Sequence, residues 1–371
     1  NYTTFEESLF KYTLINCVKV ILIYFYFMKK ILIILLLIPS LSWGAVTFKN
    51  GVRVDETADY FELREVTNNE AVCNDGKLAN YWIAKQDSDK WLIQFPGGGS
   101  GWPAKYFKNR DQFLKSPVSK DHNNRFLKSS GIAEQFFSMG YNVIWLHYCS
   151  SDNYGGNHFN LIDGQQVPFK GKLIVDSIIN EYKKDLENST DLVVAGTSAG
   201  TYGIIFNIHL ISKFKPKLIL DGIWRDDFQK SDEVEKQDWF YQTDDFVPYL
   251  WGELPDHCNG DFYNGCWIDR KTLDKHDIKK AFIIMNYGDP FNFVNKEEQI
   301  EKFVASFKSD AEYFGGGYSI NAEKFQLEGQ QKWGHGLLIP NDDYNKKIDG
   351  VSLSSLIEKW IGGESPIFIR Y

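Results

Sequence analysis

The sequence predicts a doubly wound, mostly parallel α/β sheet that carries an aromatic-rich insertion. Near-continuous apolar runs bounded by Gly, Asp or Asn recur along the chain, which is typical of strands buried on both faces. Helix-compatible stretches fall between these runs, and strands that alternate with helices build parallel sheets. The predicted strands are 91–95, 142–148, 191–195, 217–220 and 281–285, and the predicted helices are 132–139, 173–186, 199–212 and 297–307.

Further elements are predicted before, within and after this series of alternating strands and helices. Short alternating stretches predict antiparallel strands at the start of the sheet, at 51–55, 60–66 and 80–85. The segment 223–279 interrupts the alternation and is rich in aromatic residues, so we interpret it as a cap rather than a second core. Near the end of the chain, 322–327 predicts the last strand and 351–360 a helix.

The composition is that of a globular protein. Of 371 residues, 43% are hydrophobic and 24% are charged, which excludes collagen-like, low-complexity and wholly disordered chains. The net charge of −8 argues against a dedicated nucleic-acid binder, and we expect no nucleic-acid partner. Aromatic residues reach 16%, which either serves sugar stacking or follows from the residue bias of an AT-rich genome.

The first part of the chain differs from the rest. Met28 is the first methionine, and two lysines, eight apolar residues and small residues around Gly44 follow it. This pattern predicts a signal peptide at 28–44, cleaved near Gly44, and a secreted or periplasmic protein. No apolar run reaches the roughly 20 residues of a membrane span, so we expect none after cleavage. We interpret 1–27 as a non-native upstream extension and 45–371 as one domain.

Export determines how the cysteines are interpreted. Cys17 precedes the predicted signal peptide, and the four remaining cysteines of an exported chain predict two disulfides. Three pairings are possible; we favour the short closure Cys258–Cys266, which leaves Cys73–Cys149. Zinc binding is the alternative, but no second ligand pair stands at metal spacing. We therefore expect no metal and no cofactor.

The strongest chemical motif is Gly196-Thr197-Ser198-Ala199-Gly200. An apolar strand precedes it and a helix-compatible run follows it, which is the strand–turn–helix setting of a nucleophile elbow. Small residues allow the tight turn that holds the serine in a strained conformation facing solvent. The motif therefore predicts a nucleophile elbow with Ser198 as the nucleophile.

A serine nucleophile needs a base and an acid, which follow it along the chain in this fold. His335 is the expected base, because it sits in a Gly-His-Gly loop after the predicted last strand. We expect the other two downstream histidines, His257 and His276, at the surface.

The acid is expected just beyond a late strand. Asp289 lies there, after the run 281–285, and Pro290 would end that strand. Asp221, after the run 217–220, is the alternative acid; its structural interpretation is an Asp that caps a loop near the elbow.

The oxyanion of an acyl-transfer reaction needs backbone N–H donors. The run Pro96-Gly97-Gly98-Gly99 follows an early strand, which is the position of the glycine loop that completes such a hole. Glycine allows close backbone approach and positive φ. We assign Gly98, Gly99 and Ala199 as donors, with a plain glycine turn or a phosphate loop as the alternatives. No Lys follows at the spacing of a phosphate loop.

Four motifs together point to one family. They are the glycine loop with the nearby Trp102, the run Tyr148-Cys149-Ser150-Ser151-Asp152, the elbow 196–200, and Asp221-Gly222. They resemble the pectin acetylesterase/Notum carboxylesterases. The resemblance implies an α/β-hydrolase fold, hydrolysis of O-acyl esters, often acetyl groups on polysaccharides, and a triad of Ser198, Asp289 and His335.

We therefore expect an exported, monomeric serine carboxylesterase whose substrate is an acylated carbohydrate or another ester, with acetyl as the acyl group. Candidate pocket residues are Trp102, Tyr202 and Trp224. A lipase-like or long-chain O-deacylase is one alternative function. A secreted carbohydrate-binding protein without catalytic activity is the other.

Overall fold

The structure is a computed structural model that describes residues 47–49, 52–54, 61–101, 131–224, 246–258, 260, 268–286, 297–320, 336–338, 344–365 and 367–370. The chain divides into two units, 1–57 and 58–371. In the first unit, β1 (Thr47–Lys49) and β2 (Val52–Val54) pair as antiparallel strands. The antiparallel strand predicted at 51–55 is therefore present, in a two-stranded sheet formed with its immediate neighbour in the chain.

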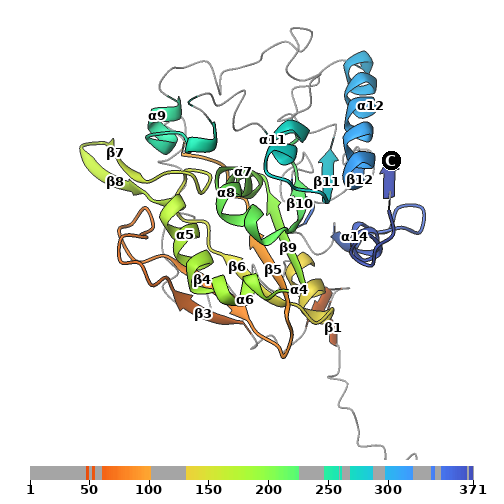
Figure 1. Cartoon of the computed structure of the whole chain (residues 1–371), viewed down its shortest axis with the longest axis horizontal. Helices are drawn as coiled ribbons and strands as arrows, with labels where there is room; N and C mark the ends of the chain where they lie inside the picture. Colours follow the sequence, from red (N-terminus) through yellow and green to blue (C-terminus); the bar gives the residue numbers. More distant parts are fainter. Residues whose placement is uncertain are drawn as a thin grey trace, which may run out of the picture. The chain divides into compact units, whose positions relative to one another are not determined.

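The second unit is built on a sheet of nine described strands in the order β13-β12-β11-β10-β9-β5-β6-β4-β3 (Figure 1). These are β3 (Glu62–Glu65), β4 (Asn80–Ala84), β5 (Lys90–Phe95), β6 (Asn142–Leu146), β9 (Asp191–Thr197), β10 (Lys217–Asp221), β11 (Ala281–Asn286), β12 (Gly315–Ile320) and β13 (Ile367–Arg370). Strand β4 is antiparallel to both β3 and β6, and the other neighbours are parallel. The predicted mostly parallel sheet is confirmed.

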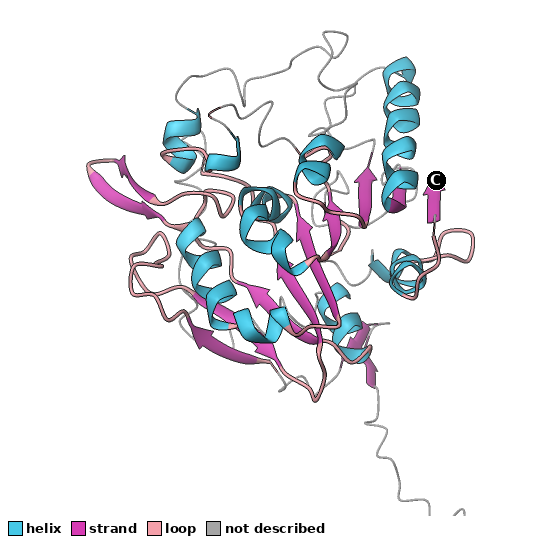
Figure 2. Ribbon diagram, in the orientation of Figure 1, coloured by secondary structure: helices cyan, strands magenta, loops and turns pink. Residues whose placement is uncertain are grey.

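Both faces of the sheet are buried, which explains the near-continuous apolar strands. In β9, Leu192 and Val194 belong to one core cluster, whereas Val193 and Ala195 belong to the other. Helices supply the second layer on each side (Figure 2). One cluster includes residues of α5 (Gly171–Glu181), α6 (Lys183–Glu187), α7 (Ala199–Phe206), α8 (Ile208–Ile211) and α12 (Glu297–Phe314), and the other includes residues of α4 (Gly131–Ser138) and α14 (Leu353–Ile361).

Several elements differ from the sequence prediction. The predicted helix 173–186 is interrupted at Tyr182 between α5 and α6, and the predicted helix 199–212 continues as a 3-10 turn at Ser212–Phe214. The segment 322–327 lies outside the described residues, and it is not the last strand, because β13 follows it. Strand β12 escaped prediction because it begins with three glycines, which have low β propensity.

A hairpin of β7 (His158–Ile162) and β8 (Gln165–Phe169) was also not predicted. Figure 1 shows it projecting from the body next to α9 (Phe246–Trp251). His158 Nε2 lies 2.9 Å from the Tyr249 carbonyl oxygen, and Asn160 donates to the same oxygen. These contacts join the hairpin to the first described helix of the predicted cap.

The described part of the segment 223–279 packs against the body of the second unit. It contains α9, a 3-10 turn at Asp256–Cys258, and α11 (Arg270–Lys275). The buried Trp251 lies with its ring centroid 4.4 Å from that of Phe206 on α7. Leu250 and Leu273 belong to the same core cluster as α5 and α7. Part of the aromatic excess is therefore used in the core.

Helix α7 lies unusually close to β5, and glycine makes this approach possible. A Cβ on Gly200 would lie 1.8 Å from the Phe95 carbonyl oxygen, far inside van der Waals contact. A Cβ on Gly203 would lie 2.6 Å from the Tyr154 ring. The start of α7, directly after Ser198, is thus fixed against the carboxyl end of β5.

We expect Gly200→Ala to destabilise the protein by about 3 kcal/mol or more, because the methyl group meets backbone that cannot rotate away. Gly362→Ala is the control, since its Cβ would lie 3.3 Å from the nearest atom at a φ of −66°. Urea unfolding of both variants measures the difference. Equal midpoints for the two variants would contradict the close approach.

Candidate active site

The candidate site lies where the order of strands in the sheet reverses. Strand β5 stands between β6 and β9, so the chain leaves β5 toward one side and later returns on the other. In such sheets, ligands bind outside the carboxyl ends of the strands at this point. The glycine loop follows β5, the 148–152 motif follows β6, and Ser198 follows β9. Three sequence motifs thus meet at the edge of the sheet where the carboxyl ends of these strands lie.

Ser198 has the backbone conformation of a nucleophile elbow. Its φ is 54° and its ψ is −119°, a strained conformation for a residue with a side chain. Its N–H donates to the Asp221 carbonyl oxygen at 2.9 Å, and Thr201 donates from Oγ1 to the carbonyl oxygens of Gly196 and Asp221. The turn is therefore held by hydrogen bonds to β10, the neighbouring strand.

The glycine loop packs directly on this turn. A Cβ on Gly97 would lie 2.8 Å from the Thr197 carbonyl oxygen and 3.0 Å from Ser198 Cβ. Gly98 and Gly99 are exposed beyond it, and Ala199 begins α7. The predicted donors therefore come from the two segments that meet at the nucleophile. The sequence interpretation assigned no role to Gly97, whose close approach brings these segments together.

The predicted base and acid lie outside the described residues, but their neighbours do not. Gly336, next to His335, approaches the elbow: its Cβ would lie 2.7 Å from Thr197 Cγ2. Strand β11 ends at Asn286, three residues before Asp289, and it runs parallel to β10. Both predicted residues are thus close along the chain to segments at the carboxyl edge of the sheet.

Asp221, the alternative acid, is buried at the end of β10. Its Oδ2 accepts hydrogen bonds from Thr197 Oγ1 at 3.2 Å and from the Leu338 N–H at 2.9 Å. The carboxylate therefore joins the elbow to the segment that follows His335.

The candidate pocket residues lie in different surroundings. Trp102 lies outside the described residues. Tyr202, one turn after the nucleophile, is buried, and its ring stacks on Phe206. The indole of Trp224 is fully buried, and its Nε1 donates to Asp310 on α12 at 3.1 Å. Trp224 thus packs between the end of β10 and α12.

The expectation that His257 and His276 lie at the surface is wrong. Both are half-buried, and their ring centroids lie 5.1 Å apart. His209 on α8 lies 5.2 Å from His257, whose Nε2 is 3.1 Å from the Ile205 carbonyl oxygen. Burial lowers the pKa of His257 to about 4, and it also lowers the pKa of His209 and of His276.

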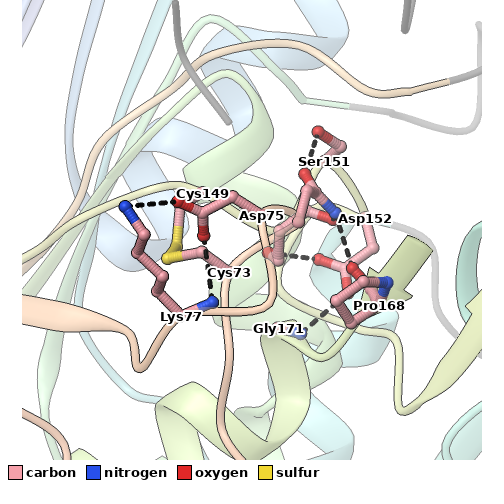
Figure 3. The surroundings of a disulfide bond; sticks show 10 residues. Cys73, Asp75, Lys77, Cys149, Ser151, Asp152, Pro168 and Gly171 are labelled. Carbon is pink, nitrogen blue, oxygen red and sulfur yellow. Dashed lines mark hydrogen bonds and ion pairs between the residues drawn. A yellow bond between two sulfur atoms is a disulfide. The ribbon is translucent and has the colours of Figure 1, made fainter. Parts of the chain in front are cut away.

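The Cys73–Cys149 disulfide is present, which confirms that predicted pair (Figure 3). Cys258 is also disulfide-bonded, and its predicted partner Cys266 lies outside the described residues. Next to the first disulfide, Asn74 accepts from Ser151 Oγ and donates to the carbonyl oxygens of Ser150 and Pro168. The disulfide segment therefore binds the loop after β6.

Asp152 organises this loop from within. Its fully buried carboxylate accepts four hydrogen bonds, from Ser150 Oγ at 2.6 Å and from the N–H groups of Tyr154, Gly156 and Gly171 at 2.8–3.1 Å. A Cβ at Gly171, the first residue of α5, would lie 2.3 Å from Asp152 Oδ1. Burial raises the pKa of Asp152 to about 7, although these hydrogen bonds lower it.

The described residues contain no group of three His, Cys, Asp or Glu side chains placed to hold a metal ion. Within the same residues, no helix combines the length and apolar character needed to cross a membrane.

A sequence model of the family described as pectinacetylesterase matches residues 54–223. This part of the chain is pectinacetylesterase-like. The predicted resemblance to the pectin acetylesterase/Notum carboxylesterases is therefore confirmed. The matched range contains the glycine loop, the 148–152 motif, the elbow and Asp221.

Known relatives agree with this match. Two palmitoleoyl-protein carboxylesterases, notum2 of Xenopus laevis and notum1a of Danio rerio, are 27% and 28% identical over 158 and 168 residues. The alignments cover 41% and 43% of this chain but 32% and 33% of the relatives, so the chain matches about a third of their length. The solved structure of the Wnt deacylase Notum from Drosophila has a TM-score of 0.57 at 19% identity, over 81% of this chain and 93% of that chain. This likeness confirms the α/β-hydrolase-like fold.

We expect the stabilising contribution of Asp152 to fall as the pH rises. Its pKa lies near 3.8 in the unfolded chain and about 7 in the folded protein, so the folded state binds the proton more tightly. The difference in free energy of unfolding between the parent and Asp152→Asn should therefore decrease by about 3 kcal/mol between pH 4 and 7. Denaturant titrations across this range measure it. A difference that increases with pH would mean that the four donors outweigh burial.

Proposed function

We propose that this chain is an exported carboxylesterase that hydrolyses O-acyl esters with Ser198 as nucleophile. The observation that carries the proposal is the strained Ser198 backbone with a glycine loop packed against it. Strain of this kind persists only where the surrounding structure enforces it, and it clusters at functional sites. The pectinacetylesterase match and the relatives' names as carboxylesterases support the same chemistry.

The proposed reaction is acyl transfer to water. His335 accepts the Ser198 hydroxyl proton while Oγ attacks the ester carbonyl carbon, and the carbonyl electron pair moves to oxygen. The N–H groups of Gly98, Gly99 and Ala199 stabilise this oxyanion. Its collapse breaks the bond to the alcohol, which leaves with the proton from His335.

The second half of the reaction releases the acid. His335 takes a proton from water, the hydroxide attacks the acyl-enzyme, and collapse of the second oxyanion returns the proton to Ser198. Asp289 would hold the imidazole in the required tautomer and stabilise its positive charge. The strand–turn–helix order and the contact of Gly336 with Thr197 support these assignments.

For the substrate, we infer an O-acetyl ester on a polysaccharide. The family description supports the acetyl group, and the predicted signal peptide supports an extracellular substrate. A long-chain O-deacylase is the second candidate, because the relatives are named for palmitoleoyl-protein esters. A carbohydrate-binding protein without catalysis would have no need for the strained elbow.

We expect Ser198→Ala to lower kcat/KM for p-nitrophenyl acetate by about 10⁴-fold or more, because the nucleophile is removed. Ser177→Ala is the control, since this buried serine on α5 bonds to Thr67 and Asn68. Steady-state kinetics of both purified variants measure this change in kcat/KM. Parent-like activity of Ser198→Ala would rule out the proposed nucleophile.

The acyl group is tested with p-nitrophenyl esters from acetyl to palmitoyl, followed by acetylated pectin and acetylated xylan. An acetyl-sized pocket excludes extra methylenes, so we expect kcat/KM to fall at least about tenfold between acetyl and octanoyl. Release of acetate from the polysaccharides would then identify the leaving alcohol. A rise in kcat/KM with chain length would instead favour the long-chain deacylase.

A further inference from the structure

The glycine loop is held at both ends by the loop after β6. Tyr154 donates its hydroxyl to the Pro96 carbonyl oxygen at 3.0 Å, and Tyr148 donates to the Gly99 carbonyl oxygen at 2.7 Å. A third bond runs from the Gly101 N–H to the Ser151 carbonyl oxygen at 2.7 Å.

We propose that Tyr148 and Tyr154 are positioning residues that fix the glycine loop in the geometry needed to stabilise the oxyanion. The proposal rests on the proposed esterase function, because it concerns the donors of that reaction. The two hydroxyls do not need to contact the substrate. They act on the peptide groups that flank the donors.

Peptide geometry explains how two bonds to carbonyl groups restrict the donors that lie between them. A trans peptide is planar, and its C=O and N–H point in opposite directions, so a fixed carbonyl also fixes the following N–H. The bonds at Pro96 and Gly99 therefore restrain the first and last peptide planes of the run. The N–H groups of Gly98 and Gly99 lie between these planes. A run of glycines otherwise has wide freedom in φ and ψ, and preorganised donors are what make an oxyanion hole effective.

The two phenols are themselves held rigidly. The Tyr154 side chain is fully buried, with its ring centroid 5.3 Å from that of Phe95 and 4.6 Å from that of Tyr148. Tyr148 Oη also accepts the Asn153 N–H at 2.9 Å. Burial raises the pKa of Tyr154 well above its usual value, and its hydroxyl therefore remains a donor at all working pH values.

The loop that carries the tyrosines is strained in a way that suits this role. Ser151, Asn153 and Tyr154 have φ values of 58°, 54° and 61°, which residues with side chains seldom adopt. A residue held in such a conformation needs enforcement by its surroundings. Asp152, between them, supplies it through its four hydrogen bonds.

The test compares Tyr148→Phe, Tyr154→Phe and the double variant with the parent. Tyr141→Phe is the matched control. Tyr141 is buried, and its hydroxyl donates a hydrogen bond to Asp191 Oδ2 at 2.7 Å, at the amino end of β9. Each variant is assayed for kcat and KM on p-nitrophenyl acetate, for its Ki with a methyl trifluoromethyl ketone, and for thermal stability. The Ser198 Oγ adds to the carbonyl carbon of the ketone, and the resulting negatively charged oxygen lies in the oxyanion hole.

We expect each single substitution to lower kcat and raise Ki about tenfold, and the double variant to do so about 10²-fold or more, with KM within about twofold of the parent. Tyr141→Phe should lose comparable thermal stability and keep the parental Ki. A parental Ki in both single variants, or an equal rise in Tyr141→Phe, would overturn the proposal. Such a result alongside an inactive Ser198→Ala leaves the proposed function standing, whereas parent-like activity of Ser198→Ala contradicts the proposed nucleophile.

Discussion

The site depends on one buried carboxylate. Asp152 has no access to water, and a charged or polar group in that position is tolerated only when its hydrogen-bonding capacity is met. Its four donors come from both sides of the β7–β8 hairpin, so meeting that requirement fixes the loop after β6 against the start of α5. Trp251 adds the predicted cap to this arrangement by donating from Nε1 to the Asp152 carbonyl oxygen at 2.7 Å.

The fixed position of this loop determines how the groups proposed to act in the reaction are placed. The fixed loop directs Tyr148 and Tyr154 to the glycine loop, Gly97 lets that loop approach Ser198, and Asp221 joins the elbow to the segment after the predicted base. Each step uses a hydrogen bond to a backbone carbonyl, a hydrogen bond to the Asp221 carboxylate, or a glycine where a side chain would collide. The active conformation is therefore a property of packing at the carboxyl edge of the sheet, and the strain at Ser198 is one local result of it.

The sequence predicted the parts of this arrangement that leave a local pattern. Strands buried on both faces show as apolar runs, and the elbow shows as small residues between a strand and a helix. Strand β12 was missed because its glycines hide the pattern, and the β7–β8 hairpin because its exposed face is mixed, with Phe159 and Leu161 among polar residues. The role of Asp152 could not be predicted, since Gly171 is 19 residues away along the chain. Asp289 and His335 stay predictions, supported by chain order and by the contacts of Gly336.

The most direct measurement is a crystal structure of the protein after reaction with a small fluorophosphonate. We expect phosphorus bonded to Ser198 Oγ, with the phosphoryl oxygen accepting hydrogen bonds from the N–H groups of Ala199 and the glycine loop. The Tyr148 and Tyr154 hydroxyls should still donate to the Gly99 and Pro96 carbonyl oxygens. An unmodified Ser198, or a phosphoryl oxygen directed away from the glycine loop, would contradict this expectation.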